Sequence, residues 1–187
     1  MKKVLLAGLM ILLIIGLAKA SFAVPGSITL NSAIESGGDY SNGINIWFEA
    51  GTYDFSVVSG GWNAWSNVSG CSSQGTDCLT GWMWSMDIYQ PSTSTSFRLG
   101  SKIDRYETQS QALSAHASDH LVLNQPTDGD LWFYIKDGIP GDGKLFVSDN
   151  TGSVTVAVAP EPMGTILFVV GGATFGLRRF LNKRRSG

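Results

Sequence analysis

The feature that most constrains the fold is a series of short β-strand signals separated by clusters of glycine, serine, asparagine and aspartate. Short apolar or alternating runs between such turn-forming clusters are typical of an antiparallel β-sandwich. We therefore predict an all-β protein. The expected strands are Ser27–Ile34, Ile44–Glu49, Thr52–Ser59, Trp82–Tyr89, Ser96–Leu99, His120–Asn124, Leu131–Lys136 and Ser153–Val158. Residues 107–117 fit either a short helix or an inserted loop.

The chain has 187 residues, 43% of them hydrophobic, which suits one domain with short additions. Two lysines precede the apolar run Val4–Leu17, and small-x-small cleavage sites end at Ala20 and Ala23. This order is typical of a signal peptide, whereas an uncleaved anchor usually has a longer apolar run. We expect a helical signal peptide in residues 1–23, an exported sandwich domain in 24–159 and a separate tail in 160–187.

The expected exported body is acidic. Between Val24 and Pro160 there are five basic and fourteen acidic residues, a net charge of −9. Phosphates are repelled by such a surface, so nucleic acid is not an expected partner. Divalent cations are favoured, although an acidic surface also serves solubility alone.

Cys71 and Cys78 are the only cysteines, and both lie in the expected exported body. In an oxidising compartment we expect them to pair as a structural disulfide. A zinc role is not indicated, because no further Cys or His lies nearby at zinc-ligand spacing.

The sequence contains no pattern that indicates an enzyme. A nucleophile elbow and a phosphate-binding loop are both absent. His116 and His120 are four residues apart and would share a face on a helix, but the glutamate of the zinc-protease motif is missing. We interpret these two histidines as solvent-exposed polar residues in a loop.

The segment Asp130–Val158 carries the main candidate site. It is predicted to form two strands around a loop that contains glycine and proline, and the loop holds Asp137, Asp142, Asp149 and Asn150. Oxygen side chains returned to the end of a strand pair are suitable ligands for calcium. Asp, Asn and Gly also fill turns for conformational reasons alone, and the spacing is not that of an EF-hand.

The six tryptophans all lie between residues 47 and 132. Most are expected in the core, where an indole is stable if its N–H finds an acceptor. Trp62 and Trp65 flank a loop rich in Gly, Asn and Ser, and both cannot easily point inward. Exposed rings beside the loop that carries Asp142 would suit the apolar face of a sugar.

The segment from Asp137 to Asn150 begins at the end of a strand, continues through a Gly/Pro-rich loop and ends in the pair Asp149-Asn150. This order resembles the end of the bacterial galactophilic calcium lectins and of related galactose-binding-like jelly rolls. The earlier Gly61-Trp62-Asn63-Ala64-Trp65 also matches that pattern. The resemblance implies a calcium held by Asp137, Asp149, Asn150 and the Trp65 carbonyl, with the metal ordering the hydroxyls of a bound galactose. Residues 144–147 make the loop longer than in that family.

The end of the chain has three parts. Pro160-Glu161-Pro162 precedes an apolar run, Met163–Leu177, and a basic cluster that begins with Arg178 and Arg179. As a helix the run covers only about 22 Å of the ~30 Å hydrocarbon core, so flanking residues would have to complete a crossing. Basic residues after an apolar helix stay on the cytoplasmic side. We therefore expect a short transmembrane helix with the body outside.

This order of Pro-Glu-Pro, short helix and arginine cluster closely resembles the PEP-CTERM sorting signal of Gram-negative bacteria. The resemblance implies cleavage by an exosortase, a membrane protease, and transfer of the body to the cell surface or matrix beside exopolysaccharide. The combined expectation is a surface protein that binds carbohydrate with calcium. A structural matrix protein without specific sugar binding is the alternative, and a permanent single-pass anchor is the alternative for the tail.

Overall fold

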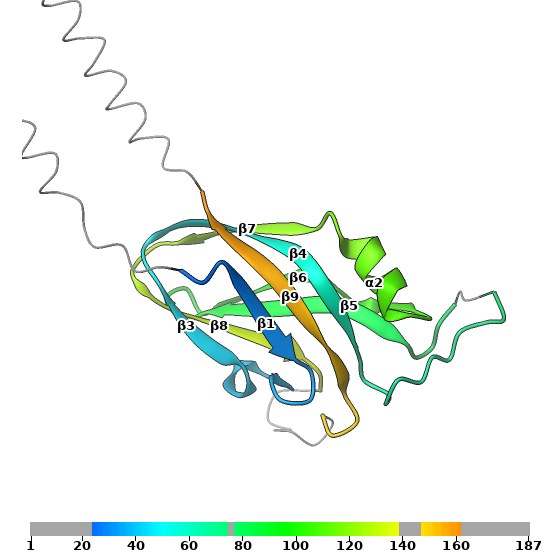
Figure 1. Cartoon of the computed structure of the whole chain (residues 1–187). Helices are drawn as coiled ribbons and strands as arrows, with labels where there is room; N and C mark the ends of the chain where they lie inside the picture. The colour runs from blue at the N-terminus through cyan, green and yellow to red at the C-terminus, as the bar shows by residue number, and fades with distance from the viewer. Residues whose placement is uncertain (1–23, 75–76, 139–146, 162–187) are drawn as a thin grey trace, which may run out of the picture.

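The computed structural model describes residues 24–74, 77–138 and 147–161. Most of these residues are in β-strands, as the sequence predicts (Figure 1). The helices within these ranges are the short 3-10 helix η1, Tyr40–Asn42, and α2, Gln109–His116. The strands are β1 Ser27–Asn31, β2 Ser36–Gly37, β3 Ile44–Phe48, β4 Gly51–Asn63, β5 Trp82–Gln90, β6 Thr95–Tyr106, β7 His120–Gln125, β8 Gly129–Lys136 and β9 Thr151–Pro160.

The strands form one curled, mixed sheet. Its main path runs β1-β9-β4-β5-β8-β2, while β3 pairs with β8, β6 with β5 and β7 with β4. The prediction of a wholly antiparallel sheet is wrong at one point, because β2 runs parallel to β8. Strand β2 has only two residues, Ser36 and Gly37. A bridge this short leaves no periodicity in the sequence from which it could be predicted.

The expected pairing of the strands around the candidate loop is also wrong. Strand β8 pairs with β5, β3 and β2, whereas β9 pairs with β1 and β4. Residues 137–150 therefore connect strands that are not neighbours in the sheet, instead of closing a hairpin. The reason is that β4 and β1 provide β9 with two long antiparallel partners, and a strand has only two edges.

The core lies inside the curl and is lined by the alternate residues of the strands. In β3, for example, Ile44, Ile46 and Phe48 face inward, while Asn45 and Trp47 are exposed. Every residue of the buried core cluster lies between Ile28 and Val158. The described residues thus pack around one hydrophobic core.

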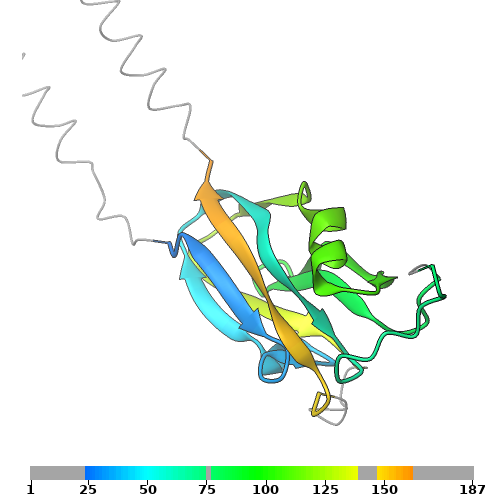
Figure 2. The same ribbon diagram turned by 45° about the vertical axis from the view of Figure 1, so that its right-hand side comes forward.

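Of the two structures predicted for residues 107–117, a short helix or an inserted loop, the helix is present as α2. Thr108 and Gln111 form a reciprocal capping box that satisfies backbone N–H groups at the start of α2. The helix covers part of β4 and β5 (Figure 2), and Ala112 is fully buried. The Gln109 side chain donates to the Gly61 carbonyl over 3.0 Å, which ties the helix to β4.

The first and last described residues lie close together at one end of the sheet. The Val158 N–H donates to the Gly26 carbonyl over 3.0 Å, and the Glu161 N–H donates to the Thr52 carbonyl over 2.9 Å. No helix among the described ranges is long and apolar enough to cross a membrane. The predicted signal peptide and the predicted tail helix, with Pro162, Arg178 and Arg179, lie outside the described residues.

Candidate functional site

A buried polar cluster lies where β8 ends and β9 begins. The Asn150 amide nitrogen donates to the Asp137 carboxylate and to the Ser36 hydroxyl, each over 2.9 Å. The Ser36 hydroxyl in turn donates to the Ser32 carbonyl. Backbone bonds fix the same place, because the Asp137 N–H donates to the Gly37 carbonyl over 2.9 Å. The cluster therefore joins the β1–β2 connection to both ends of the candidate loop.

The surroundings of Asp137 disfavour the ionised form of its carboxyl group. Burial raises the pKa of the Asp137 carboxyl above its usual value, and the nearby negative charge of Asp149 raises it further. The hydrogen bond from Asn150 and the positive charge of Lys102 act in the opposite direction. A cation bound beside Asp137 would favour the ionised form, so binding would become weaker as the carboxyl is protonated.

The Asn150 side chain has one polar atom without a partner. The residue is only 3% exposed, and its Oδ1 atom is buried without a hydrogen bond. Such an atom costs free energy unless a water or an ion satisfies it. This amide oxygen lies on the same side chain that contacts Asp137, so it is a candidate ligand for a cation.

The segment that follows Trp65 contacts the start of β9 and the residue pair before it. The Ser66 N–H donates to the Asp149 carbonyl over 2.9 Å, and the Thr151 hydroxyl is 3.0 Å from the Asn67 side-chain oxygen. The Trp65 carbonyl accepts the Val68 N–H over 2.8 Å within a tight turn. One of its two lone pairs is therefore already used, and the other is available for a further contact.

The described residues fit a calcium ion only in part. They offer the carboxylates of Asp137 and Asp149, the free amide oxygen of Asn150 and the carbonyl of Trp65. Calcium usually has six to eight oxygen ligands. Within the described ranges no three His, Cys, Asp or Glu side chains gather closely enough to hold a metal by themselves. The predicted ligand-binding residue Asp142 lies outside these ranges.

The two tryptophans predicted to face a sugar lie in different settings. Trp62 is 1% exposed, and its indole N–H donates to the Ser85 hydroxyl over 3.2 Å, so it belongs to the core. Trp65 is half-buried, and the Arg105 guanidinium lies over its ring at 5.0 Å from the ring centre. A ligand could reach that ring only at its uncovered part or by displacing Arg105.

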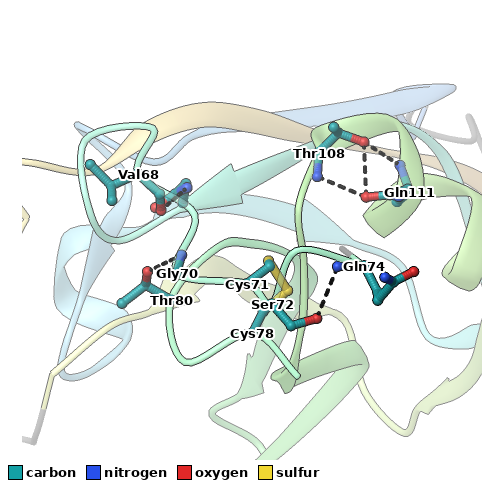
Figure 3. Close-up of a disulfide and its surroundings, with 10 residues drawn as sticks. Val68, Gly70, Cys71, Ser72, Gln74, Cys78, Thr80, Thr108 and Gln111 are labelled. Atoms are coloured by element: carbon teal, nitrogen blue, oxygen red, sulfur yellow. Dashed lines mark hydrogen bonds between the residues drawn. A yellow bond between two sulfur atoms is a disulfide. The ribbon is translucent and has the colours of Figure 1, made fainter. Parts of the chain in front are cut away.

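The predicted disulfide between Cys71 and Cys78 is present (Figure 3). It closes a short loop within the connection from the end of β4 to the start of β5 (Figure 2). At the base of the loop, the Gly70 N–H donates to the carbonyl and to the hydroxyl of Thr80, and the Leu79 N–H donates to the Gly70 carbonyl. The crosslink restrains a projecting loop, away from the buried core cluster.

The two histidines do not form a common site. His116 ends α2, whereas His120 begins β7, so the spacing of four residues does not place them on one helix face. The His116 ring is 2.7 Å from the Asp119 carboxylate, and the His120 ring is 3.3 Å from the Asp54 carboxylate. Each imidazole has its own acidic neighbour.

A group of aromatic residues on the outside of the sheet was not predicted. It contains Tyr40, Trp47, Tyr89 and Trp132, which we call the aromatic row. The signal was present in the sequence, because Trp47 and Trp132 alternate with apolar neighbours that face the core.

Comparisons with known proteins give no relative for this chain. No family model, curated protein sequence or solved structure matches it.

Proposed function

We propose that this chain is an exported surface protein whose body binds extracellular carbohydrate with the help of a calcium ion. The observation that carries the proposal is the contact between Asp137 and Asn150, with a buried Asn150 oxygen left free beside it. In the proposed site, Asp137, Asp149 and Asn150 hold the ion by their side chains, and Trp65 contributes its carbonyl. The ion would supply a fixed positive charge that orders sugar hydroxyls.

The type of fold is part of the same proposal. A β-sandwich of the galactose-binding-like type would place the ligand loops at one end of two opposed groups of strands. The strands β1, β9 and β4 on one side and β3, β8 and β5 on the other are consistent with this architecture. In that arrangement, the cluster of Asp137 and Asn150 supports a site at the end of the sandwich.

The substitution Asp137→Asn is expected to abolish calcium-dependent retention on galactose-bearing agarose without unfolding the protein. Asparagine keeps the size and one oxygen of the aspartate but removes its charge, which is the main attraction for calcium. Because burial disfavours the charged carboxyl, the variant should melt at the same temperature as the wild type, or slightly higher, when calcium is absent.

The matched control is Asp104→Asn, which removes a carboxylate from an exposed position on β6. This control should be retained like the wild type. Retention that survives in Asp137→Asn would remove the assignment of the site. Retention of the wild type that does not respond to calcium or free galactose would instead favour the structural matrix protein.

We also propose that the tail directs surface sorting by an exosortase-type protease. The Pro-Glu-Pro motif begins inside the fold: Pro160 pairs with Tyr53 across the β4–β9 ladder, and Glu161 is bound to Thr52. A peptide within a β-ladder is a poor substrate for a protease, which binds extended and accessible chain. Cleavage is therefore expected after Glu161, or after the end of β9 has separated from β4.

Replacing Pro160, Glu161 and Pro162 by alanine is expected to leave the body at the inner membrane with its tail uncleaved. Fractionation of cells with a tag placed after Val24 would measure this. The control keeps the motif and replaces exposed Asp104 and Glu107 by alanine, and this control should still be processed. Equal processing of both variants would contradict the sorting proposal, and a tail that remains intact in the wild type would indicate a permanent anchor.

A further inference from the structure

The aromatic row crosses three neighbouring strands on the outside of the sheet. Trp47 lies on β3, Trp132 on β8 and Tyr89 on β5, and Tyr40 comes from the helix η1 that follows β2 (Figure 1). Strand β8 pairs with both β3 and β5. Because neighbouring strands are about 4.8 Å apart, a row from β3 to β5 extends over roughly 10 Å.

All four side chains point away from the core. The neighbours of Trp132 in β8, Leu131 and Phe133, are fully buried in the core cluster, and none of the four aromatic residues belongs to that cluster or packs against it. Trp47 is 41% exposed and Tyr40 is 36% exposed, while Tyr89 and Trp132 are partly buried. The rings therefore form an accessible surface that the core does not require.

The rings are held in place by the backbone and by each other. Tyr40 stacks on Tyr89 with ring centres 4.0 Å apart and planes 9° apart, and its edge meets Trp132 at 5.7 Å. Tyr89 and Trp132 are direct cross-strand partners, and Trp47 is diagonal to Trp132. A ligand that binds these rings would thus cost little side-chain entropy.

The short helix that carries Tyr40 is itself fixed against the sheet. Asp39 caps η1 by accepting the Ser41 N–H over 2.9 Å. After η1, Gly43 lies so close to β8 that an added Cβ would be 2.3 Å from the Phe133 carbonyl oxygen. Only glycine permits this close approach, which holds η1 down on the sheet and Tyr40 against Tyr89.

The groups around the rings are polar rather than aliphatic. Asn45 and Asp130 are exposed and are the cross-strand partners of Trp132 and Trp47. Beyond Tyr89, the Asp87 carboxylate is paired with Arg98, and exposed Ser96 is the partner of Tyr89. Amides, carboxylates and hydroxyls beside flat rings suit a ligand with an apolar face and an edge of hydroxyl groups.

We propose that the aromatic row is a binding surface for an extended, uncharged hexose polysaccharide, whose sugar rings stack on Trp47, Trp132 and Tyr40. Asn45 and Asp130 accept or donate hydrogen bonds to the sugar hydroxyls. This surface is separate from the proposed calcium site and does not depend on it. It gives the body a second place to hold the same class of polymer.

The negative charge of the body favours uncharged polysaccharides over anionic ones as ligands. The region between Val24 and Pro160 has a net charge of −9, and the row itself adjoins Asp130 and Asp39. An anionic polymer would be repelled by these groups. A protein partner is less well matched, because the core of a protein interface is depleted in charged residues, whereas the row is bordered by carboxylates.

The test is affinity electrophoresis of the full chain in a detergent without a sugar headgroup. The gels contain galactomannan, mixed-linkage β-glucan or, as the anionic polymer, alginate, each with calcium or with a chelator. The variants are Trp47→Ala, Trp132→Ala and Tyr40→Ala, and melting temperatures establish that each is folded. The control is Ile103→Ala, which removes an apolar side chain that is more exposed than the aromatic row, at 76%, from β6.

We expect at least one uncharged polymer to retard the wild type and Ile103→Ala equally, with or without calcium. Trp47→Ala should weaken this retardation about tenfold, as for a central binding residue. If Trp132→Ala does not fold, Trp47→Ala and Tyr40→Ala still decide the question, since their side chains are the more exposed.

Three results of the binding assay would each overturn the proposal. These are no retardation by either uncharged polymer, retardation by alginate alone, and retardation that persists in Trp47→Ala and Tyr40→Ala. Self-association that is lost in Trp47→Ala, without polysaccharide binding, would also overturn it and identify a protein interface. None of these outcomes affects the calcium site, which is tested separately by Asp137→Asn.

Discussion

Gly60→Ala is expected to lower the free energy of unfolding by about 3 kcal/mol or more, one of the two largest effects that we predict. Gly60 has a φ angle of +90°, which side-chain-bearing residues rarely adopt. An added Cβ would be 1.9 Å from the Ser153 carbonyl oxygen, a backbone atom of β9 that cannot move alone. Denaturation by urea, measured by circular dichroism, tests this prediction.

The position matters because β4 changes direction there. The register between β4 and β9 shifts between Val57 and Ser59, just before Gly60. Before the shift β4 pairs with β7, and after it Trp62 and Asn63 reach β5. The matched control is Gly26→Ala, where an added Cβ meets nothing within 4 Å, and it should change the stability by less than about 0.5 kcal/mol. Equal effects of the two substitutions would contradict this account of the bend.

Arg98→Ala is expected to destabilise the protein by about 2–3 kcal/mol at neutral pH. Arg98 contacts the Asp87 carboxylate through two nitrogens, at 2.8 and 3.2 Å. Asp87 is only 4% exposed, so the substitution leaves a buried carboxylate without its main partner. The double variant Asp87→Asn, Arg98→Ala should recover most of the loss, because the buried charge is then gone as well. A double variant less stable than Arg98→Ala would contradict this explanation.

The pH dependence of the same variant follows from the pKa of Asp87. Burial raises the pKa of this carboxyl above its ordinary value of 3.8, while Arg98 opposes the rise. Without Arg98 the folded-state pKa moves higher still. A group whose folded pKa is raised loses stability as pH increases through that pKa. The deficit of Arg98→Ala should therefore be smallest below pH 3.8 and grow as the pH rises through the folded pKa of Asp87.

The strand positions could be predicted because the alternation of apolar and polar residues is local. All eight predicted strands occur, with ends shifted by up to four residues except in β6, which extends seven residues beyond its predicted end. The pairing of β9 could not be predicted, because it depends on which strands meet across the curled sheet. The residues of β9 alternate equally well for a partner in β8 or in β4. The two-residue strand β2 has no pattern of its own.

The sequence indicates which residues belong to the candidate site, but it does not indicate which residues they contact. The oxygen side chains of Asp137 and Asn150 could be found from their place among turn residues, and the structure does bring them together. The contribution of Ser36 comes from a segment 101 positions before Asp137 in the numbering, and no local spacing indicates it. The aromatic row could have been found for Trp47 and Trp132, whose alternation places them outside, but not for Tyr40, which η1 positions.

The most direct test of the proposed function is calorimetric titration of calcium into the chelator-stripped chain. We expect a saturable heat for the wild type that is lost in the double variant Asp137→Asn, Asp149→Asn. We also expect calcium at a hundred times its dissociation constant to stabilise the wild type by about 2.7 kcal/mol. An absence of heat, together with a melting temperature that does not respond to calcium, would contradict the proposed site. The hydrogen bond between Asp137 and Asn150 would then serve only to connect the ends of β8 and β9.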